Sequence, residues 1–348
     1  MSYTTKQWLL KESPRDFLEL DKTFEMVTKG VSVQDLKDGE LLVKTTHLSN
    51  DPAQRVWISK YFEEERSYRK PIMPGELMEA ICVGEVIESK DPKFQKGDLI
   101  QADLGWTQYS IIPSSKALFK VTVPPADWLS LGHTALTAYF GLLRVGAATS
   151  NDKTIVISGA AGATGIIACQ IAKNVLGVEK VIGIAGTDEK CAILKEYGCD
   201  IALNYKSSSF KEDFVKATPD WIDVYFDNVG GEILDTALRR MKDFGRVIAC
   251  GAISTYDVTG QSDNGLNKIS PQAWTQIILS KVRVEGFIIF QFEDQWLKGI
   301  EDIQNWVIEG KIKPLKHVWE ATIEGTPEGM IKLSKGENIG KLITQLIY

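Results

Sequence analysis

Hydrophobic residues follow two different patterns along the chain. In the first 125 residues they form short runs over Glu40–Thr45, Glu79–Ile87 and Gln108–Ile112, separated by turn residues such as Lys96-Gly97-Asp98. Short apolar runs between clusters of Gly, Pro and Asp are typical of β-strands. This part of the chain is therefore predicted to be a β-rich domain that ends near Pro124-Pro125.

From about Trp128 to Phe292, short apolar runs alternate with amphipathic segments. Short apolar strands that alternate with helices indicate a parallel sheet covered on both faces. The region is therefore predicted to be an α/β domain. Its predicted strands are Thr154–Ser158, Val181–Ala185, Asp223–Phe226, Arg246–Cys250 and Arg283–Ile289, and its predicted helices are Gly165–Leu176, Glu189–Tyr197 and Ile233–Met241.

The last part of the chain returns to strand signals. Trp296, Ile300, Ile303 and Val307 share one face of a predicted helix of about five turns after Asp294. Strands are then predicted at 319–323 and 342–347. We therefore predict a first domain made of residues 1–126 and 302–348, and a second made of residues 127–301.

Composition and charge narrow the class of protein. Apolar residues make up 44% and charged residues 25% of the 348 residues, as in globular proteins. The net charge of −6 and the absence of a basic stripe argue against nucleic-acid binding. No apolar run approaches the roughly 20 residues of a spanning helix, and the N-terminus lacks a signal-peptide pattern. A cytoplasmic protein without a membrane anchor is expected.

The five cysteines are scattered and never spaced C-x-x-C, which argues against a disulfide framework and a structural zinc site. Free thiols fit a reducing compartment. Only three histidines, His47, His133 and His317, are present, far apart and without nearby ligands. No metal site is predicted.

The central motif is the glycine-rich segment from Ser158 to Gly165, S-G-A-A-G-A-T-G, which follows a strand and opens a helix. Gly162 allows the backbone to approach a pyrophosphate, and Gly165 allows close packing of helix and sheet. The free N–H groups at the helix start, on Ala163 and Thr164 among others, face the negative charge. A dinucleotide site is predicted here, although a tight turn that binds nothing is the alternative. A second glycine segment, Gly336–Leu342, lacks the spacing and context of a phosphate loop.

The end of the next strand bears on cofactor choice. Enzymes that use NAD usually carry a carboxylate there for the ribose 2′-hydroxyl. This chain has Ala185-Gly186 at that place, with Lys190 one turn into the following helix. A small residue with a nearby cation accommodates a 2′-phosphate, so the pattern favours NADPH. Two alternatives stay open: Lys190 as a solvated lysine, and Asp188 or Glu189 pointing inward.

Several motifs in order along nearly the whole chain resemble the zinc-independent medium-chain reductases of the prostaglandin reductase and alkenal double-bond reductase type. The resemblance implies a Rossmann doubly wound parallel sheet plus a β-rich GroES-like domain. It is carried by 136–143 (LTAYFGLL), 160–165 (AAGATG), 184–190 (IAGTDEK), 204–206 (NYK), 225–231 (YFDNVGG), 250–256 (CGAISTY) and 336–341 (GENIGK).

The same resemblance implies roles for individual residues around NADPH. The pyrophosphate would lie against Gly162 to Gly165, and Lys190 and Tyr205 would contact the 2′-phosphate. Asn228 would bond near the ribose or pyrophosphate, unless it only caps a turn; Tyr205 could likewise be an ordinary strand-end aromatic. The remaining residues implied to line the cofactor are Thr137, Cys250, Gly251, Ala252, Ile253, Ser254, Thr255, Tyr256, Phe287, Ile288, Ile289 and Asn338.

The chain departs from the family on the substrate side. The family commonly has Asp-Pro-Tyr-Met-Arg, whereas Ala53 replaces the tyrosine in Asp51–Arg55. A second family tyrosine, about eight residues before Phe287, corresponds to Leu279 here. Cofactor choice therefore carries over from the resemblance, and substrate preference does not.

The predicted reaction is NADPH-dependent reduction of the C=C bond of an α,β-unsaturated aldehyde or ketone, with hydride added to the β-carbon. The resulting enolate needs a hydrogen-bond donor, which the resemblance implies is the nicotinamide ribose hydroxyl. Tyr256 is the best remaining protein proton donor, although it could serve only to pack against the cofactor. Trp106 is expected as an apolar wall or as core. Alternatives are NADPH:quinone reduction and a non-catalytic NADPH-binding or redox-sensing protein. A homodimer is plausible by resemblance.

Overall fold

The computed structural model describes the whole chain except residues 16, 60–64, 66 and 258–268. Its chain divides into two compact units, Met1–Leu129 with Lys316–Tyr348, and Ser130–Leu315. The sequence pattern predicts boundaries at 126/127 and 301/302. The second boundary lies later because α10 (Trp296–Ile308) contributes Trp296 and Ile303 to the core of the second unit.

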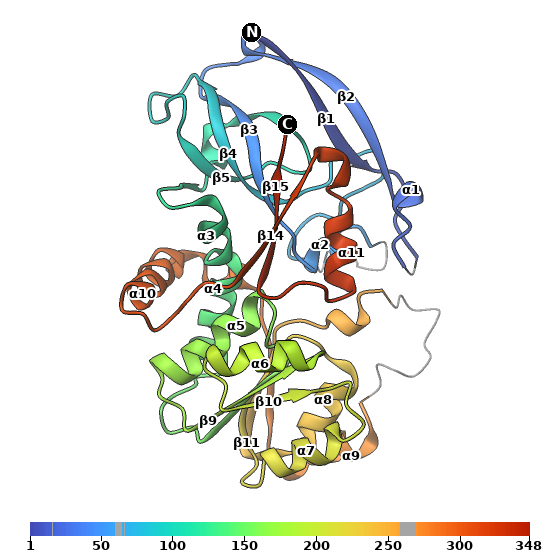
Figure 1. Cartoon of the computed structure of the whole chain (residues 1–348), viewed down its shortest axis with the longest axis vertical. Coiled ribbons are helices and arrows are strands. Elements are labelled where there is room, and N and C mark those ends of the chain that lie inside the picture. The colour runs from blue at the N-terminus through green and yellow to red at the C-terminus, as the bar shows by residue number, and fades with distance from the viewer. Residues whose placement is uncertain (16, 60–64, 66, 258–268) are drawn as a thin grey trace. The chain divides into compact units, whose positions relative to one another are not determined.

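The first unit is rich in β-strands, as its apolar runs between turn residues predict, and all of its described strand pairs except β14–β15 are antiparallel (Figure 1). Among its described residues, six strands follow one another in the order β14-β15-β3-β4-β5-β7. A seventh strand of this sheet, β6, pairs with β3, while β1 and β2 pair separately. The elements are β1 Ser2–Leu10, α1 Leu20–Thr23, β2 Phe24–Ser32, β3 Glu40–Ser49, α2 Ala53–Trp57, β4 Ile81–Ser89, β5 Leu99–Asp103, β6 Tyr109–Pro113, β7 Phe119–Lys120, α3 Pro125–Ser130 (whose last residue enters the second unit), β14 Lys316–Ala321, α11 Glu328–Ser334 and β15 Lys341–Leu346.

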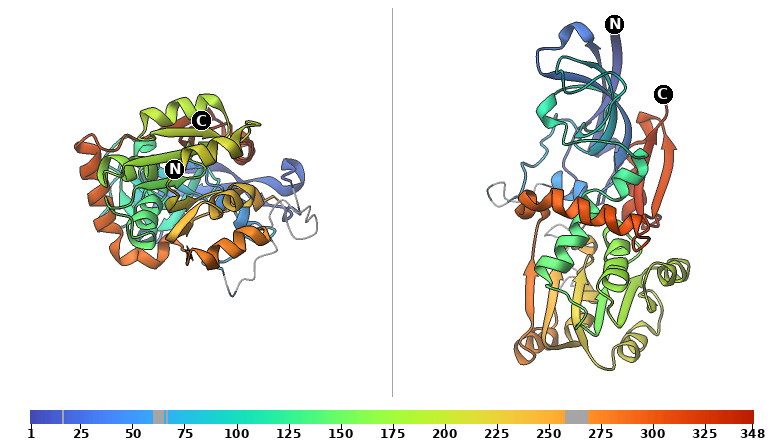
Figure 2. Two further views of the ribbon diagram at one scale, coloured as in Figure 1. Left: turned by 90° about the horizontal axis from the view of Figure 1, so that it is seen from below. Right: turned by 90° about the vertical axis from the view of Figure 1, so that its left-hand side faces the viewer.

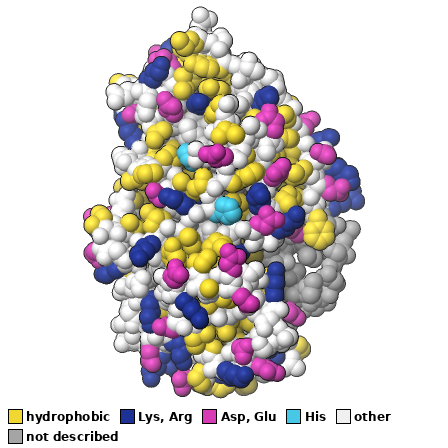
Figure 3. Space-filling view, in the orientation of Figure 1, with side chains coloured by type: hydrophobic (Ala, Val, Ile, Leu, Met, Phe, Trp, Pro, Cys, Tyr) yellow, Lys and Arg dark blue, Asp and Glu magenta, His cyan; other side chains and the backbone are white. Residues whose placement is uncertain are grey.

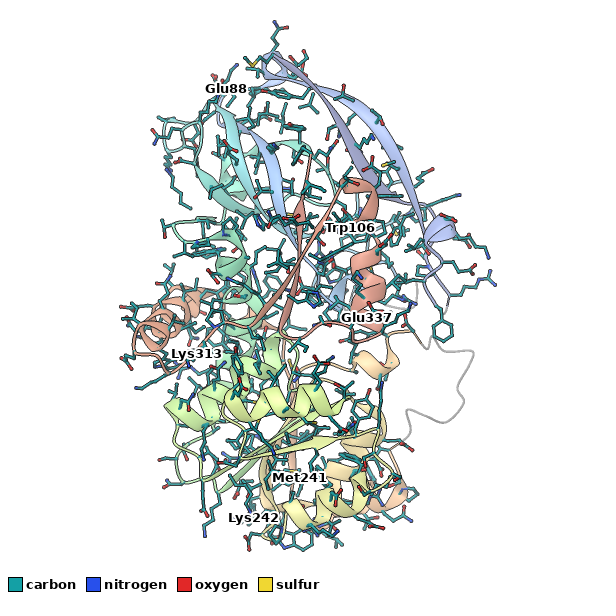
Figure 4. The ribbon with its side chains drawn as sticks, in the orientation of Figure 1. Glu88, Trp106, Met241, Lys242, Lys313 and Glu337 are labelled. Atoms are coloured by element: carbon teal, nitrogen blue, oxygen red, sulfur yellow. The ribbon has the colours of Figure 1, made fainter. Side chains whose placement is uncertain are left out.

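Trp106, labelled in Figure 4, lies in the core of this unit. Its side chain is fully buried, and its ring centroid is 5.1 Å from that of Phe24 on β2. Of the two roles expected for Trp106, the structure shows the core one. The β1–β2 ribbon is an element that the sequence analysis did not predict.

The second unit contains a parallel sheet with the strand order β10-β9-β8-β11-β12-β13 in its described part (Figure 1). The reversal of strand order at β8 is the doubly wound arrangement. The elements are α4 His133–Phe140, β8 Thr154–Ile157, α5 Ala163–Gln170, β9 Lys180–Ala185, α6 Asp188–Glu196, β10 Ile201–Asn204, α7 Phe210–Ala217, β11 Ile222–Asp227, α8 Gly231–Leu238, β12 Met241–Ala249, α9 Pro271–Leu279, β13 Arg283–Gly286 and α10.

Helices cover both faces of this sheet, as predicted from its uninterrupted apolar strands (Figure 2). Side chains alternate between the two faces of a strand. On β11, Val224 and Phe226 enter the core on the side of α4 and α5, whereas Tyr225 enters the core on the side of α7 and α8.

Several predicted boundaries in this unit differ from the structure. The strand predicted over Arg283–Ile289 is β13, which ends at Gly286. Met241 was expected to end a helix, but it begins β12 together with Lys242 at the amino end of the strand (Figure 4). The helix after Asp294 has 13 residues, fewer than five turns need. The segment 165–176 is one helical stretch whose second half, Ile171–Val175, is a π-helical turn.

No helix in the described residues is long and apolar enough to cross a membrane. On the face drawn in Figure 3, basic and acidic side chains are interspersed.

Candidate functional site

The carboxyl ends of the six parallel strands gather most of the predicted site residues at one edge of the second unit's sheet. The glycine turn follows β8, and Lys190 lies on α6 after β9. Tyr205 follows β10 and Asn228 follows β11. Ligands of open α/β sheets bind at this edge, at the point where the strand order reverses. The segment Cys250–Tyr256 follows β12, and Phe287, Ile288 and Ile289 follow β13.

The glycine turn is closed by backbone contacts that leave no room for side chains. Gly159 has a φ of +56°, which favours glycine. A Cβ on Gly165 would lie 2.4 Å from the carbonyl oxygen of Gly159 and 2.6 Å from Cα of Ala160. Gly162 is the N-cap of α5, and no side chain caps this end. The first N–H groups of the helix, on Ala163, Thr164 and Gly165, therefore point toward an external acceptor.

A buried carboxylate, which the sequence analysis did not single out, holds this turn against the neighbouring strand. The Oδ1 atom of Asp227 accepts hydrogen bonds from the hydroxyl of Ser158 at 2.9 Å and from the hydroxyl of Tyr225 at 3.0 Å. The backbone N–H groups of Val229 and Gly230 donate to the same atom, each at 3.1 Å. Four donors on one oxygen fix the ends of β8 and β11 relative to each other.

Asn228 belongs to the same network. Its side-chain amide donates to the carbonyl oxygen of Ser158 at 2.7 Å, and its backbone N–H donates to the Ser158 hydroxyl at 2.9 Å. Asn228 therefore shapes the glycine turn directly. A signal was present in the sequence, because Ser158 and Asp227-Asn228 are polar residues that end or directly follow apolar strand runs.

Burial governs the ionisation of this region. Desolvation raises the pKa of Asp227, although the donors around its carboxylate oppose the rise. Burial, with the charge of Asp227 as a smaller cause, raises the pKa of Cys250 to about 12. The thiol of Cys250 therefore stays protonated at neutral pH and is a poor nucleophile.

The loop after β12 is tied to the loop after β11. The N–H groups of Cys250 and Gly251 donate to the carbonyl oxygen of Asp227, and the Ser254 hydroxyl donates to that of Val229 at 2.6 Å. Tyr256 lies after the short 3-10 helix Ile253–Thr255, and its hydroxyl oxygen accepts from the N–H of Ala252 at 3.2 Å.

The ends of β9 and β10 bring Gly186, Lys190 and Tyr205 together. A Cβ on Gly186 would lie 3.0 Å from Cε1 of Tyr205, so the ring lies directly against this glycine. Tyr205 is 42% exposed. Desolvation, followed by the nearby charge of Lys206, lowers the pKa of Lys190, while Glu189 opposes this. Of the two carboxylates that could point inward, Asp188 accepts at its Oδ1 a hydrogen bond from the side-chain amide of Asn204 at 2.8 Å.

The remaining predicted residues differ in their surroundings. Thr137 on α4 donates its hydroxyl to the carbonyl oxygen of His133 at 2.7 Å. Phe287 and Ile289 are buried in the core of the second unit, whereas Ile288 is 41% exposed. Asn338 belongs to the first unit, where its amide donates to the carbonyl oxygen of Gly340 at 2.7 Å.

The two residues that depart from the family pattern, Ala53 and Leu279, lie at the ends of α-helices. Ala53 begins α2, and Leu279, which is 65% exposed, ends α9. Just before α2, the buried ammonium of Lys341 pairs with the carboxylate of Asp51 and donates to the carbonyl oxygen of Asn50 at 3.1 Å. The first unit thus anchors this segment through a buried ion pair.

The structure offers no fit for a zinc ion in its described part, where no three His, Cys, Asp or Glu side chains gather as ligands. His133 instead packs edge-on against Trp296, with ring centroids 5.1 Å apart. His47 is bonded to the hydroxyl of Thr46 at 3.0 Å.

Comparison with known proteins gives matches over both units. Residues 6–121 match the family described as the N-terminal domain of oxidoreductase, and residues 163–305 match the family described as zinc-binding dehydrogenase. The chain is 39% identical to prostaglandin reductase 1 of Bos taurus over 350 residues, covering 98% of each protein. It is 35% identical to the NADP(+)-dependent 2-alkenal reductase of Nicotiana tabacum, covering 99% of this chain and 98% of that one.

A solved structure also matches along the whole chain. CurA of Vibrio vulnificus, determined in complex with NADPH, superposes with a TM-score of 0.87 and 29% identity, covering 99% of each chain.

Proposed function

Because the chain belongs to the medium-chain dehydrogenase/reductase family, in the group of prostaglandin and 2-alkenal reductases, we propose that it is an NADPH-dependent reductase of the C=C bond of α,β-unsaturated aldehydes and ketones. The observation that carries the proposal is the carboxyl edge of the second unit's sheet. There an uncapped helix start follows a glycine turn, and a strand tip without a carboxylate stands beside Lys190 and Tyr205.

The residues at this edge fit NADPH. No side chain caps the start of α5, so its first N–H groups can bind the pyrophosphate. Lys190 and Tyr205 would hold the 2′-phosphate, and Asn228 would keep the glycine turn in shape. The segment Cys250–Tyr256 and residues Thr137, Phe287, Ile288, Ile289 and Asn338 are proposed to complete the cofactor site.

The bound cofactor supplies a hydride to the β-carbon of the substrate. The chain's own task is to hold the reactants and to provide the proton that the α-carbon gains. Tyr256 is proposed as this donor, because it carries a phenol in the loop that follows β12 at the carboxyl edge of the sheet, where the N–H of Ala252 donates to its oxygen. Cys250 is not expected to attack the substrate as a nucleophile, because its raised pKa keeps its side chain in the thiol form.

The activity is tested by following NADPH consumption with a panel of alkenals, enones and quinones. We expect turnover of alkenals or enones and a product saturated at the former double bond. Turnover of quinones alone would replace the proposal by quinone reduction, and NADPH binding without any turnover would make the protein a non-catalytic binder.

Tyr256→Phe tests the proton donor. General acids contribute about 100-fold or more to rate, so kcat is expected to fall while the KM for NADPH changes little. An unchanged kcat across the pH range would remove Tyr256 from the chemistry and leave it as a packing residue.

A homodimer is also proposed, through the edge strand β13. Its four residues are all exposed, and Trp274 and Ile278 of α9 are 60% and 65% exposed apolar side chains of the same unit. An unpaired strand edge is a template for pairing with another chain. Analytical ultracentrifugation of the wild type and of Val284→Lys tests this proposal. We expect the wild type to sediment as a dimer and Val284→Lys as a monomer. A monomeric wild type would contradict the proposal.

A cytoplasmic location is proposed from the state of the cysteines. All five are free thiols, which is typical of a reducing compartment. Microscopy of a fluorescent fusion would test it.

A further inference from the structure

The short segment after β10 faces the start of α6. Asn204, the last residue of β10, is paired with Ala185, the last residue of β9, and the N–H of Tyr205 donates to the carbonyl oxygen of Ala185 at 3.0 Å. Residues 205 and 206 therefore emerge beside Gly186 and the first turn of α6. This is the place where the proposed function puts the 2′-phosphate of NADPH.

Asn204 orders this corner with both ends of its amide. Its Oδ1 accepts from the backbone N–H of Lys206 at 3.0 Å, which fixes the turn that carries this lysine. Its Nδ2 donates to the carboxylate of Asp188 at 2.8 Å. The carboxylate closest in sequence to the strand tip is thereby bound to an uncharged partner and not to either lysine.

Lys206 brings a second positive charge to the corner. Its charge is close enough to Lys190 to contribute to the lowered pKa of that ammonium, and its Nζ lies 5.8 Å from the ring centroid of Tyr205. None of the ion pairs formed by the described carboxylates includes Lys206. Two like charges beside an exposed tyrosine ring repel each other until an anion lies between them.

We propose that Lys206 is a second cation of the 2′-phosphate site and a determinant of the preference for NADPH over NADH, with Asn204 as the residue that positions it. The inference rests on the proposed NADPH function, because it assigns the 2′-phosphate to the corner between β9 and β10. A dianionic phosphate with two lysines and a tyrosine hydroxyl around it has donors for each of its free oxygens.

The first test is calorimetric binding of NADP⁺, NAD⁺ and 2′,5′-ADP to the whole chain. For Lys206→Gln we expect NADP⁺ and 2′,5′-ADP to bind about tenfold more weakly, the size typical of one lost charged hydrogen bond. Binding of NAD⁺ should change less than twofold. Lys206→Arg should keep most of the preference. Lys216→Gln, at the far end of α7, should behave as the wild type and serves as the matched control.

The second test does not depend on affinity. In a phosphorus NMR titration of bound NADP⁺, a second nearby cation lowers the pKa of the 2′-phosphate. Lys206→Gln should therefore raise this pKa relative to the wild type, and Lys216→Gln should leave it unchanged. Asn204→Ala should shift it in the same direction as Lys206→Gln, since the turn that carries Lys206 is released.

The two levels of the proposal fail in different ways. If the wild type binds NADP⁺ and NAD⁺ equally, the corner is no 2′-phosphate site and the proposed cofactor is wrong. If the wild type prefers NADP⁺ but Lys206→Gln alters neither the preference nor the phosphate pKa, the site stands and Lys206 has no part in it.

Discussion

The carboxyl edge of the second unit's sheet and the α2 segment of the first unit are held in place by opposite means. The glycine turn is fixed by backbone contacts and by N–H groups that converge on Asp227. The α2 segment is fixed by side chains, through the ion pair of Asp51 with the buried Lys341. Ala53 begins the helix that this ion pair precedes.

The difference explains why the two regions depart from the family to different degrees. A turn made of backbone atoms tolerates few residue types, because any Cβ at Gly165 meets main-chain atoms. A helix that is held in place by an ion pair outside the helix keeps its position when one of its own exposed or half-buried side chains is substituted. Residues on α2 can therefore be substituted more freely than residues of the glycine turn.

The largest effect is expected from Gly165→Ala. Its Cβ would be 2.4 Å from a backbone oxygen, which cannot move without opening the turn. We expect a loss of about 100-fold or more in NADPH affinity, or unfolding of the second unit. Fluorescence titration and circular dichroism measure the two outcomes. Gly30→Ala, where a Cβ meets nothing within 4 Å, should change neither NADPH affinity nor folding. If both variants kept the NADPH affinity of the wild type, the backbone contacts of the glycine turn would not fix the site.

Lys341→Met removes one partner of the ion pair in the first unit. A carboxylate left without its buried partner typically costs about 3–5 kcal/mol of unfolding free energy. Chemical denaturation should show this loss, while NADPH titration of the remaining folded protein should be near normal. The exposed Lys335→Met is the control. A loss of cofactor affinity as large as the loss of stability would mean that the two anchors are not independent.

Asp227→Asn tests how the carboxylate that holds the glycine turn contributes to stability as the pH changes. Because burial raises the pKa of Asp227, the folded chain keeps its proton at pH values where the unfolded chain has released it. The contribution of Asp227 to stability is then fully present below the unfolded pKa of about 4 and is lost as pH rises through the folded pKa. The wild type should lose at most about 1.4 kcal/mol per pH unit in that window relative to Asp227→Asn.

Denaturation of both proteins between pH 4 and 8 measures this difference. A constant difference across the window would show that the carboxylate is ionised throughout, held so by its four donors.

The smallest effect is expected from Ala53→Tyr, which restores the family's hydroxyl on α2. One neutral hydrogen bond to the developing enolate is worth about 1 kcal/mol, or about fivefold in kcat/KM for an enone. Ala53→Phe adds the ring without the hydroxyl. Equal gains from both variants would attribute the effect to packing.

Much of the fold could be predicted because it depends on local patterns. The strands of the parallel sheet are apolar runs, and the glycine turn lies between one of them and a helix. The β1–β2 ribbon escaped prediction because its strands are only partly buried and pair with residues up to 30 positions away. The start of β12 at Met241 was read as helix, since apolar residues at its beginning continue the spacing of α8.

The candidate site divides in the same way. Residues next to strand ends could be named from the sequence, but their partners could not. Ser158 and Asp227 are 69 positions apart and meet only because β8 and β11 are neighbours in the sheet. The bond of Asn204 to Lys206 is of the local type that asparagine forms with the backbone two residues on, whereas its bond to Asp188 has no sequence pattern that predicts it.

The contact between Gly186 and Tyr205 constrains how this enzyme can evolve. A strand-tip carboxylate, the usual mark of an NADH enzyme, would place its Cβ 3.0 Å from the tyrosine ring. The first mutation toward the other coenzyme would thus require the part-exposed ring of Tyr205 to move away by a few tenths of an ångström. The two positions are therefore coupled in evolution, because the residue accepted at 186 depends on the side chain at 205.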